Sequence, residues 1–201
     1  MHQMMKHLRK IKLTLPAVFL LSALMFLSAA KPLTDSSDQK IADQLNQHHC
    51  LALNIYWEAR SEPLQGQLAV AAVTMNRVRS QSFPDNVCDV VKQGGERRHQ
   101  CQFSWWCDGK SDKPMDMEAW SLAQEIAWTG MMLSPKDPTE GALFYHATYV
   151  KPDWSQSMIR TTKIGKHLYF IDPDMAKESQ ALHVASSAPE PDTRDLLSQL
   201  Y

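Results

Sequence analysis

Motifs that mark several common enzyme classes are missing from this chain of 201 residues. No serine stands in a Gly-x-Ser-x-Gly elbow, no His-Glu-x-x-His pair occurs, and the 7 glycines form no phosphate-binding loop. Serine hydrolase, zinc peptidase and nucleotide chemistry therefore lose support. No repeat at solenoid spacing occurs either, and the ordinary composition, 44% hydrophobic and 21% charged, fits one globular domain with tails.

A hydrophobic run of full membrane-spanning length is also lacking. The longest apolar run covers residues 13–27, which is short for a transmembrane helix. Four basic residues precede it, and Ser28-Ala29-Ala30 follows with the small side chains that a signal peptidase reads. We predict a signal peptide over residues 1–30; an uncleaved anchor, associated with the inner membrane, stays open. Either one places the rest of the chain outside the cytoplasm, in the periplasm or cell envelope.

The part of the chain that would be exported has no excess of positive charge. Without residues 1–30 the chain keeps 17 basic and 22 acidic residues, a net charge of −5. Nucleic acids and anionic membranes bind proteins largely through clustered positive charge. We therefore expect no nucleic-acid partner.

The chain has only four cysteines, an even number, at positions 50, 88, 101 and 107. In an exported chain this number predicts two disulfides, for which three pairings are possible. Cys101–Cys107 with Cys50–Cys88 is our working assignment, and the other two pairings stay open. The cysteine and histidine spacings match no recognised zinc motif, so we predict neither a metal site nor another cofactor.

The chain is expected to consist of a linker, one domain and a tail. Residues 31–46 are polar and are interpreted as the linker, and residues 47–173 as the domain. Residues 174–201 mix Ser, Ala, Pro and acidic residues, a composition typical of a mobile tail.

Within the domain, the hydrophobic periodicity predicts helices first and strands afterwards. The expected helices are Cys50–Arg60, a second capped by Ser61 that runs to Arg79, a shorter one from Phe83-Pro84 to Gly94-Gly95, and Pro114–Met132. The expected strands lie within Gly141–Val150 and Ile164–Phe170, which are rich in β-formers. Helices followed by a small sheet indicate an α+β domain.

Glu58 is the most informative residue for chemistry. It lies seven positions after Leu51 and three after Ile55, so on a helix it shares their apolar face. A carboxyl there points into the core or lies at the lip of a cleft, and burial would raise its pKa so that it can donate a proton near neutral pH. The structural alternative, an ion pair of Glu58 with Arg60 or Arg77 that holds the helix, stays open.

Two further segments hold side chains that suit carbohydrate binding. Residues 102–106, Gln-Phe-Ser-Trp-Trp, place amide, hydroxyl and aromatic groups between two cysteines. The alternative is a disulfide-pinned surface loop with Phe103 and Trp105 packed inward. His146 lies in a strand-like run, where it either faces a cleft or is a hydrogen-bonded structural histidine.

Several of these segments together resemble the SleB/CwlJ-type cell-wall hydrolases, which include spore cortex-lytic enzymes and exported relatives in Gram-negative bacteria. The matching segments, over about residues 50–170, are the run from Cys50 through Tyr-Trp-Glu58-Ala-Arg to Glu62-Pro63, Gln65-Gly-Gln, Asn76-Arg77-Val78, Phe83-Pro84, Cys101-Gln-Phe-Ser, Tyr145-His146-Ala-Thr-Tyr and Ile164-Gly-Lys-His167. The family's usual glycine after Glu-Ala-Arg is Ser61 here, a change that we interpret as tolerated because serine serves as a helix cap.

The resemblance implies a lysozyme-like α+β fold, a helical domain with a small antiparallel sheet, and cleavage of peptidoglycan glycan strands by a muramidase or lytic transglycosylase reaction. The family's catalytic glutamate maps onto Glu58, and whether Glu62 assists stays open. The residues expected to contact substrate are Gln102, Phe103, Trp105 as a platform for sugar rings, Tyr145 and His146.

Two other functions stay open at this point. One is a noncatalytic peptidoglycan-binding or scaffold protein. The other is a metal-dependent peptidoglycan amidase that would use His146, His167 and a carboxylate.

Overall fold

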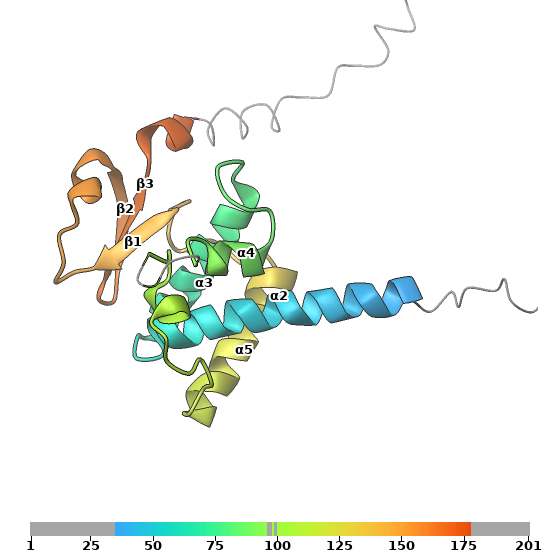
Figure 1. The fold of residues 1–201 in the computed structure, drawn as a ribbon. Coiled ribbons are helices and arrows are strands. Elements are labelled where there is room, and N and C mark those ends of the chain that lie inside the picture. The colour runs from blue at the N-terminus through green and yellow to red at the C-terminus, as the bar shows by residue number, and fades with distance from the viewer. Residues whose placement is uncertain (1–34, 96–97, 99, 178–201) are drawn as a thin grey trace, which may run out of the picture. The chain divides into compact units, whose positions relative to one another are not determined.

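The structure, a computed structural model, describes residues 35–95, 98 and 100–177 (Figure 1). The predicted signal peptide or anchor of residues 1–30 and the predicted tail beyond residue 177 lie outside the described residues. The chain divides into two compact units, Met1–Ile41 and Ala42–Tyr201, and the residues proposed to be functional all belong to the second. In the part of the chain that is described, no helix is long and apolar enough to cross a membrane.

Helices come first along the chain and a small antiparallel sheet follows, as the sequence predicts (Figure 1). This arrangement confirms the α+β class. The elements are α2 (Asp35–Ala59), α3 (Leu64–Arg79), α4 (Val87–Lys92), the 3₁₀ helix η1 (Ser104–Cys107), α5 (Met117–Met132), β1 (Phe144–Ala147), the 3₁₀ helix η2 (Asp153–Ser157), β2 (Ile159–Ile164) and β3 (His167–Ile171).

Helix α2 begins earlier than the periodicity predicts. We expected a linker up to residue 46, but the chain is helical from Asp35 onward. Residues 36–46 are exposed, which explains their polar composition, because a solvated helical turn needs no apolar face. Hydrophobic periodicity indicates a helix only where one face of the helix is apolar and buried, so residues 36–46 gave no helical pattern.

The predicted starts of the three other helices are wrong by a few residues; α5 begins at Met117 and not at Pro114. Ser61 is exposed and does not cap α3; Pro63 stands at the cap position, where its missing N–H costs no hydrogen bond. Helix α4 begins at Val87, not at Phe83-Pro84, because the Asn86 side chain accepts a hydrogen bond from the N–H of Asp89.

The hydrophobic core forms around the buried face of α2. Leu51 and Ile55 are fully buried there, and Val90 and Val91 of α4 and Ala127 of α5 belong to the same cluster. A second cluster joins α3 to the sheet through Ala69, Val73, Ala142 and Tyr169. Tyr145 of β1 packs against this cluster, which therefore positions the sheet on α3.

The sheet has the order β1-β3-β2, and both pairings are antiparallel. We expected a single strand over Ile164–Phe170, but this segment holds the end of β2, a turn at Gly165-Lys166 and most of β3. Gly165 has a φ of +55°, which favours glycine. The sequence shows β-formers on both sides of this glycine, and only the backbone reversal separates them into a hairpin.

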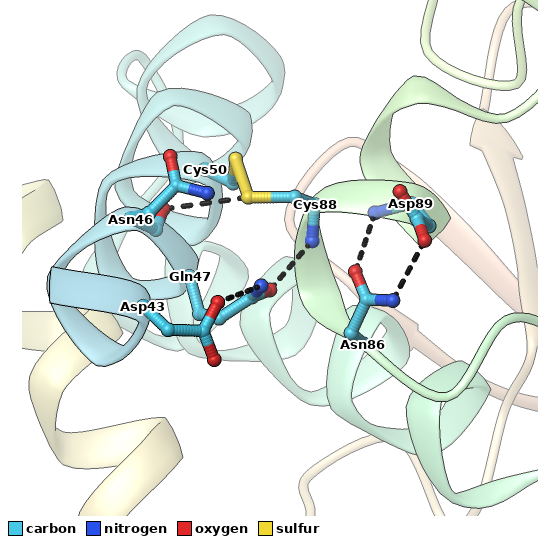
Figure 2. The surroundings of a disulfide bond; sticks show 7 residues. All are labelled: Asp43, Asn46, Gln47, Cys50, Asn86, Cys88 and Asp89. Atoms are coloured by element: carbon cyan, nitrogen blue, oxygen red, sulfur yellow. Dashed lines mark hydrogen bonds between the residues drawn. A yellow bond between two sulfur atoms is a disulfide. The ribbon is translucent and has the colours of Figure 1, made fainter. Parts of the chain in front are cut away.

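Both disulfides of the working assignment are present, and no cysteine of the chain is free. Cys50–Cys88 joins α2 to α4, with Cα atoms 5.2 Å apart (Figure 2). Beside it, the Gln47 side chain accepts a hydrogen bond from the Cys88 N–H at 2.9 Å. Cys101–Cys107 closes the loop that contains η1.

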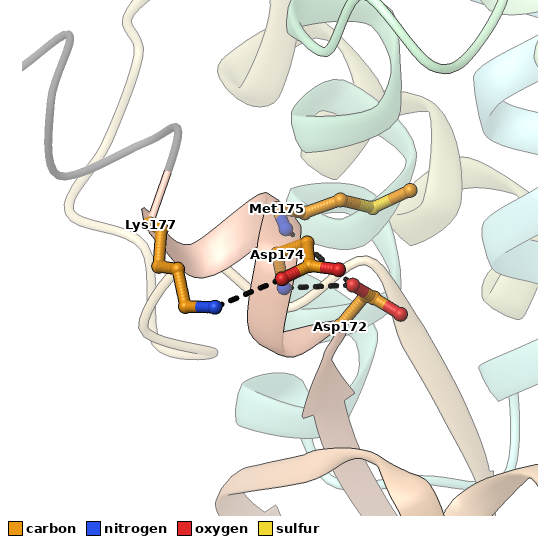
Figure 3. Close-up of polar contacts among 4 residues, drawn as sticks. All are labelled: Asp172, Asp174, Met175 and Lys177. Carbon is orange, nitrogen blue, oxygen red and sulfur yellow. Dashed lines mark hydrogen bonds and ion pairs between the residues drawn. The ribbon is translucent and has the colours of Figure 1, made fainter.

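The described chain ends in one helical turn after β3 (Figure 3). The Asp172 carboxylate accepts hydrogen bonds from the N–H groups of Asp174 and Met175, and Lys177 pairs with Asp174 at 2.9 Å. Asp172 therefore follows the last strand of the sheet and caps the helical turn after it.

Candidate active site

Glu58 lies in the last turn of α2, on the same face as the buried Leu51 and Ile55, as its spacing predicts. Its side chain is half-buried. The Glu58 Oε2 atom accepts a hydrogen bond of 3.0 Å from the Tyr145 hydroxyl, which comes from β1, 87 residues further along the chain. The end of α2 and the first strand of the sheet thus meet at this carboxyl.

Burial raises the pKa of the Glu58 carboxyl above its ordinary value. The hydrogen bond from Tyr145 and the positive charge of Arg77 both act in the opposite direction, because each stabilises the carboxylate. Burial is the larger effect, so Glu58 holds its proton to a higher pH than an ordinary glutamate. A partly exposed carboxyl with this property suits a general acid.

Tyr145 stays a neutral hydrogen-bond donor over the whole physiological range. Burial raises its pKa well above the ordinary value, and the neighbouring Glu58 raises it further, because two negative charges would repel each other. The hydroxyl is therefore able to donate to Glu58 in both protonation states of the carboxyl.

The two ion pairs considered for Glu58 do not occur among the described residues. Arg60 is exposed, and its guanidinium lies over the rings of Tyr56 and Trp57, 4.9 and 4.7 Å from their centroids. Arg77 is buried and donates from Nε to the Leu143 carbonyl at 2.7 Å. Glu58 is thus not held by a direct salt bridge.

Glu62 has a different environment from Glu58. It is only 7% exposed, and its Oε2 atom accepts a hydrogen bond of 2.9 Å from the Lys166 backbone N–H, in the turn between β2 and β3. A side chain at Gly165 would collide with this carboxylate, so the close approach requires glycine there. This hydrogen bond therefore links the turn between β2 and β3 to the connection between α2 and α3, where Glu62 lies.

Phe103 and Trp105 do not line an accessible surface, so the structure gives no support to the prediction that they contact substrate. Phe103 is 2% and Trp105 is 7% exposed. The Trp105 Nε1–H donates to Asn54 at 3.1 Å inside the core, which explains why so polar a loop carries a buried indole. Both side chains pack inward, as in the disulfide-pinned surface loop considered as the alternative. Gln102, beside them, is exposed.

His146 lies on the opposite face of the sheet from Tyr145. Consecutive residues of a strand point to opposite faces, and Tyr145 pairs with Tyr169 while His146 pairs with Leu168. The His146 ring stacks on Phe170 at 5.0 Å, and its Nδ1 lies 2.9 Å from the Ala147 carbonyl oxygen. The structure brings Tyr145 to Glu58 and turns His146 away.

Three residues near Tyr145 or Glu58 were not among the predicted substrate contacts. Tyr169 and His167 of β3 share the face of Tyr145, with ring centroids 5.7 and 5.3 Å from its ring, and Arg77 completes the group. Burial lowers the pKa of His167 and raises that of Tyr169, so both favour their neutral forms. His167 and Tyr169 are two positions apart, so the sequence indicates that they share one face of a strand. Which residues of β1 lie on that face depends on the strand register, which the sequence does not give.

No group of three or more His, Cys, Asp or Glu residues in the described part of the chain is placed to hold a metal ion. The described contacts at this site are those of a titratable carboxyl with a tyrosine hydroxyl beside it and an arginine that acts on it electrostatically.

Replacing Tyr145 by Phe should raise the pKa of Glu58, because the variant loses a hydrogen bond that favours the carboxylate. The carboxyl carbon of Glu58, followed by NMR as a function of pH, gives this value directly. Tyr149→Phe is the matched control, since Tyr149 is 83% exposed and follows the same strand. An unchanged or lower midpoint in Tyr145→Phe would contradict the described role of the hydroxyl.

An α+β domain that presents one half-buried, proton-holding carboxyl is a framework for acid/base chemistry. The profile of the cell wall hydrolase family matches residues 61–170, more than half of the chain, and the chain belongs to this family. Glu58 lies three residues before the matched stretch.

Relatives and a solved structure agree with this membership. Spore cortex-lytic enzymes of Halalkalibacterium halodurans and Bacillus subtilis are 33% and 32% identical to this chain over 125 and 126 residues, 62% of the chain. These stretches are 34% and 37% of the relatives, so the chain matches about a third of their length. The catalytic domain of the germination-specific lytic transglycosylase SleB from Bacillus anthracis is 32% identical, with a TM-score of 0.50, over 63% of this chain and 94% of that domain. The likeness confirms the expected lysozyme-like class of fold.

Proposed function

We propose that this protein is an enzyme that cleaves the glycosidic bonds of peptidoglycan strands, with Glu58 as its acid/base residue. The observation that carries the proposal is the half-buried Glu58 carboxyl, whose pKa burial raises and whose only direct side-chain hydrogen bond among the described residues comes from Tyr145. The family and the names of the relatives support the substrate class, since they are a cell wall hydrolase family, cortex-lytic enzymes and a lytic transglycosylase.

In the proposed reaction, protonated Glu58 donates its proton to the glycosidic oxygen as the bond to the anomeric carbon breaks. The transition state has oxocarbenium character. Tyr145 donates a hydrogen bond to Glu58 throughout, and this bond strengthens as the carboxyl becomes a carboxylate. The negative charge that forms on Glu58 is thereby stabilised at the moment when it appears.

A second carboxylate is not required in the step that follows. Glu62, the nearest candidate in sequence, is buried and bonded to the hairpin turn, so we assign it a structural role. Glu58, now a base, removes the proton from the substrate's own hydroxyl at C6, and that oxygen attacks the anomeric carbon. The product carries an anhydro-muramic end and Glu58 regains its proton, as in a lytic transglycosylase.

Among the predicted substrate contacts, we retain Tyr145 and the exposed Gln102 as proposals. Phe103 and Trp105 lose support because they are buried, and His146 loses support because it lies on the other face of the sheet. The same register separates His146 from His167, which leaves the metal-dependent amidase without a shared ligand face.

We further propose that the enzyme acts in the periplasm or cell envelope, where peptidoglycan is found and where disulfides persist. The disulfides at Cys50–Cys88 and Cys101–Cys107 agree with such a compartment. Residues 1–30 would act there as a cleaved signal or as an anchor in the inner membrane. N-terminal sequencing of the protein recovered from the envelope fraction distinguishes the two.

The type of cleavage is tested by mass spectrometry of the soluble products from purified peptidoglycan. We expect anhydro-muramic ends from the wild type and no glycan fragments from Glu58→Gln. Reducing ends would show hydrolysis by water and would require a second acid/base group. If wild type and variant both bind sacculi and release nothing, the noncatalytic alternative replaces the enzyme.

A further inference from the structure

Charge is divided unevenly between the helices and the sheet. Residues 35–140 hold 10 basic and 15 acidic residues, a net charge of −5. Residues 141–171, which contain the sheet, hold four basic residues and one acidic residue, a net charge of +3. The four basic residues are Lys151, Arg160, Lys163 and Lys166, and all of them are exposed. The sheet is therefore the positively charged part of an otherwise acidic chain.

Arg160 and Lys163, both on the edge strand β2, lie on the same face of the sheet. In a regular strand, residues three apart point to opposite faces. The register of β2 shifts after Arg160, so that Arg160 pairs with Phe170 and Lys163 pairs with Leu168. Phe170 and Leu168 are two apart on β3 and share a face. The irregularity in β2 thus brings together two cations whose spacing in the sequence would separate them.

An aromatic cluster lies on this face beside Arg160. The Trp154 ring of η2 lies 5.7 Å from the Phe170 ring and 5.5 Å from the His146 ring, between centroids. His146 in turn stacks on Phe170, the pairing partner of Arg160. These contacts hold the indole in place, and 37% of Trp154 remains exposed. The face therefore combines cations with a fixed, accessible aromatic ring.

These cations have no acidic partner within the described part of the chain. The ion pairs found there join Lys110 to Asp108 and Lys177 to Asp174. Asp153, the acidic residue of the sheet segment, is exposed and takes part in neither pair. Charged residues on an edge strand also discourage pairing with another sheet, but acidic residues serve that purpose as well. That role does not explain the excess of one sign or the exposed indole.

We propose that this basic surface, formed by Arg160, Lys163 and Trp154 with Lys151 and Lys166 in the flanking loops, binds the carboxylates of the peptides that peptidoglycan strands carry. A guanidinium binds a carboxylate through two parallel hydrogen bonds, and a lysine adds a point charge. The indole offers a flat apolar surface to the rest of the ligand.

The basic surface and Tyr145 lie on opposite faces of the sheet, because Tyr145 pairs with Tyr169, the neighbour of Phe170. The surface therefore holds the wall while Glu58 acts on a glycan strand elsewhere. A single exposed ion pair contributes little, but a sacculus presents many carboxylates, so several weak contacts add up to retention. The inference rests on peptidoglycan as the substrate of the proposed function and not on the catalytic role of Glu58.

The experiment measures how much of the full chain sediments with purified sacculi, in the Glu58→Gln background so that the sacculi are not degraded. We expect Arg160→Gln/Lys163→Gln to lower the affinity by about 3- to 30-fold at low salt, the loss expected from two exposed ion pairs. The difference should shrink as salt is added. Circular dichroism checks the folding of each protein.

Arg79→Gln/Lys136→Gln is the matched control, because it removes one arginine and one lysine from exposed positions outside the sheet. It should bind sacculi as its parent does. An equal loss in this control and in Arg160→Gln/Lys163→Gln would show an effect of net charge alone and would overturn the inference.

A change in the ligand tests the same contact without any change in the basic surface. Sacculi whose carboxylates have been converted to amides, with a carbodiimide and ammonia, should bind the parent protein as weakly as native sacculi bind the double variant. Equal binding of native and amidated sacculi contradicts the proposal.

Vesicles that contain phosphatidylglycerol test a membrane as the partner of this surface. If Arg160→Gln/Lys163→Gln lost binding to vesicles and bound sacculi like its parent, the surface would be a membrane contact and the inference would be wrong. With Glu58 restored, we expect the double variant to have a higher KM for sacculi and an unchanged kcat. If the wild type released no glycan, the proposed function would fail, while sedimentation would still decide whether the basic surface binds the wall.

Discussion

Glu58→Gln should lower the rate of glycan release by about 10²- to 10⁴-fold, the range that a positioned acid/base contributes. Glutamine keeps the size of the side chain and an oxygen that can accept the hydrogen bond from Tyr145, but it has no proton to donate at any working pH. The rate is measured as soluble muropeptide per enzyme molecule, near the pH optimum of the wild type.

Glu62→Gln is the matched control for this substitution, because it makes the same chemical change four residues away. The amide oxygen can still accept from the Lys166 N–H, so the hairpin stays fastened and activity falls by less than about tenfold. A loss in Glu62→Gln as large as that in Glu58→Gln would show that two carboxyls carry the reaction, and the single-acid scheme would be wrong.

The same Glu58→Gln variant should be more stable than the wild type at neutral pH. Burial raises the folded-state pKa of Glu58 above its ordinary 4.5, so the folded protein binds a proton more tightly than the unfolded chain does. The contribution of Glu58 to the stability of the wild type is then fully present below about pH 4.5 and is lost as the pH rises through the raised pKa. Thermal melts of both proteins should converge in acid and separate near neutrality.

Removing the Cys50–Cys88 disulfide should produce the largest loss of stability among the substitutions considered. The bond links residues separated by 38 positions. Closing a loop of that length lowers the conformational entropy of the unfolded chain, which stabilises the folded protein by about 4 kcal/mol. Both cysteines are buried where α2 meets α4, so the double variant Cys50→Ala/Cys88→Ala also loses contacts there. The free energy of unfolding, from urea titration, measures the loss.

Cys101→Ala/Cys107→Ala is the comparison, since that bond spans a separation of only 6 and is expected to contribute about 2 kcal/mol. The first double variant should therefore be the less stable of the two. The reverse order would indicate that the loop around η1, and not the junction of α2 with α4, holds the domain together.

Local patterns were sufficient for much of the fold. The apolar spacing that ends at Glu58 placed this carboxyl correctly on the buried face of α2, because helical geometry relates residues three, four and seven apart without any knowledge of the rest of the chain. The order of helices and β-formers indicated the α+β class for the same reason.

The loop between the second pair of cysteines shows where local patterns fail. Gln102, Phe103 and Trp105 have a composition that suits both a sugar-binding surface and an inward-packed loop. Only the hydrogen bond from Trp105 to Asn54, on a helix 51 residues earlier, decides for the second. Composition describes what a side chain is able to do, but its neighbours determine whether it is accessible.

From the sequence alone, one could determine which carboxyl is unusual, that the chain has an α+β domain, and which family it resembles. The tertiary structure decided which partners that carboxyl has. Tyr145 meets Glu58 because the register of β1 on β3 selects one face of the sheet, and Arg77 acts on both because α3 packs against that face. These relations depend on contacts between residues far apart in the chain, and periodicity within one element carries no information about which face of another element it will meet.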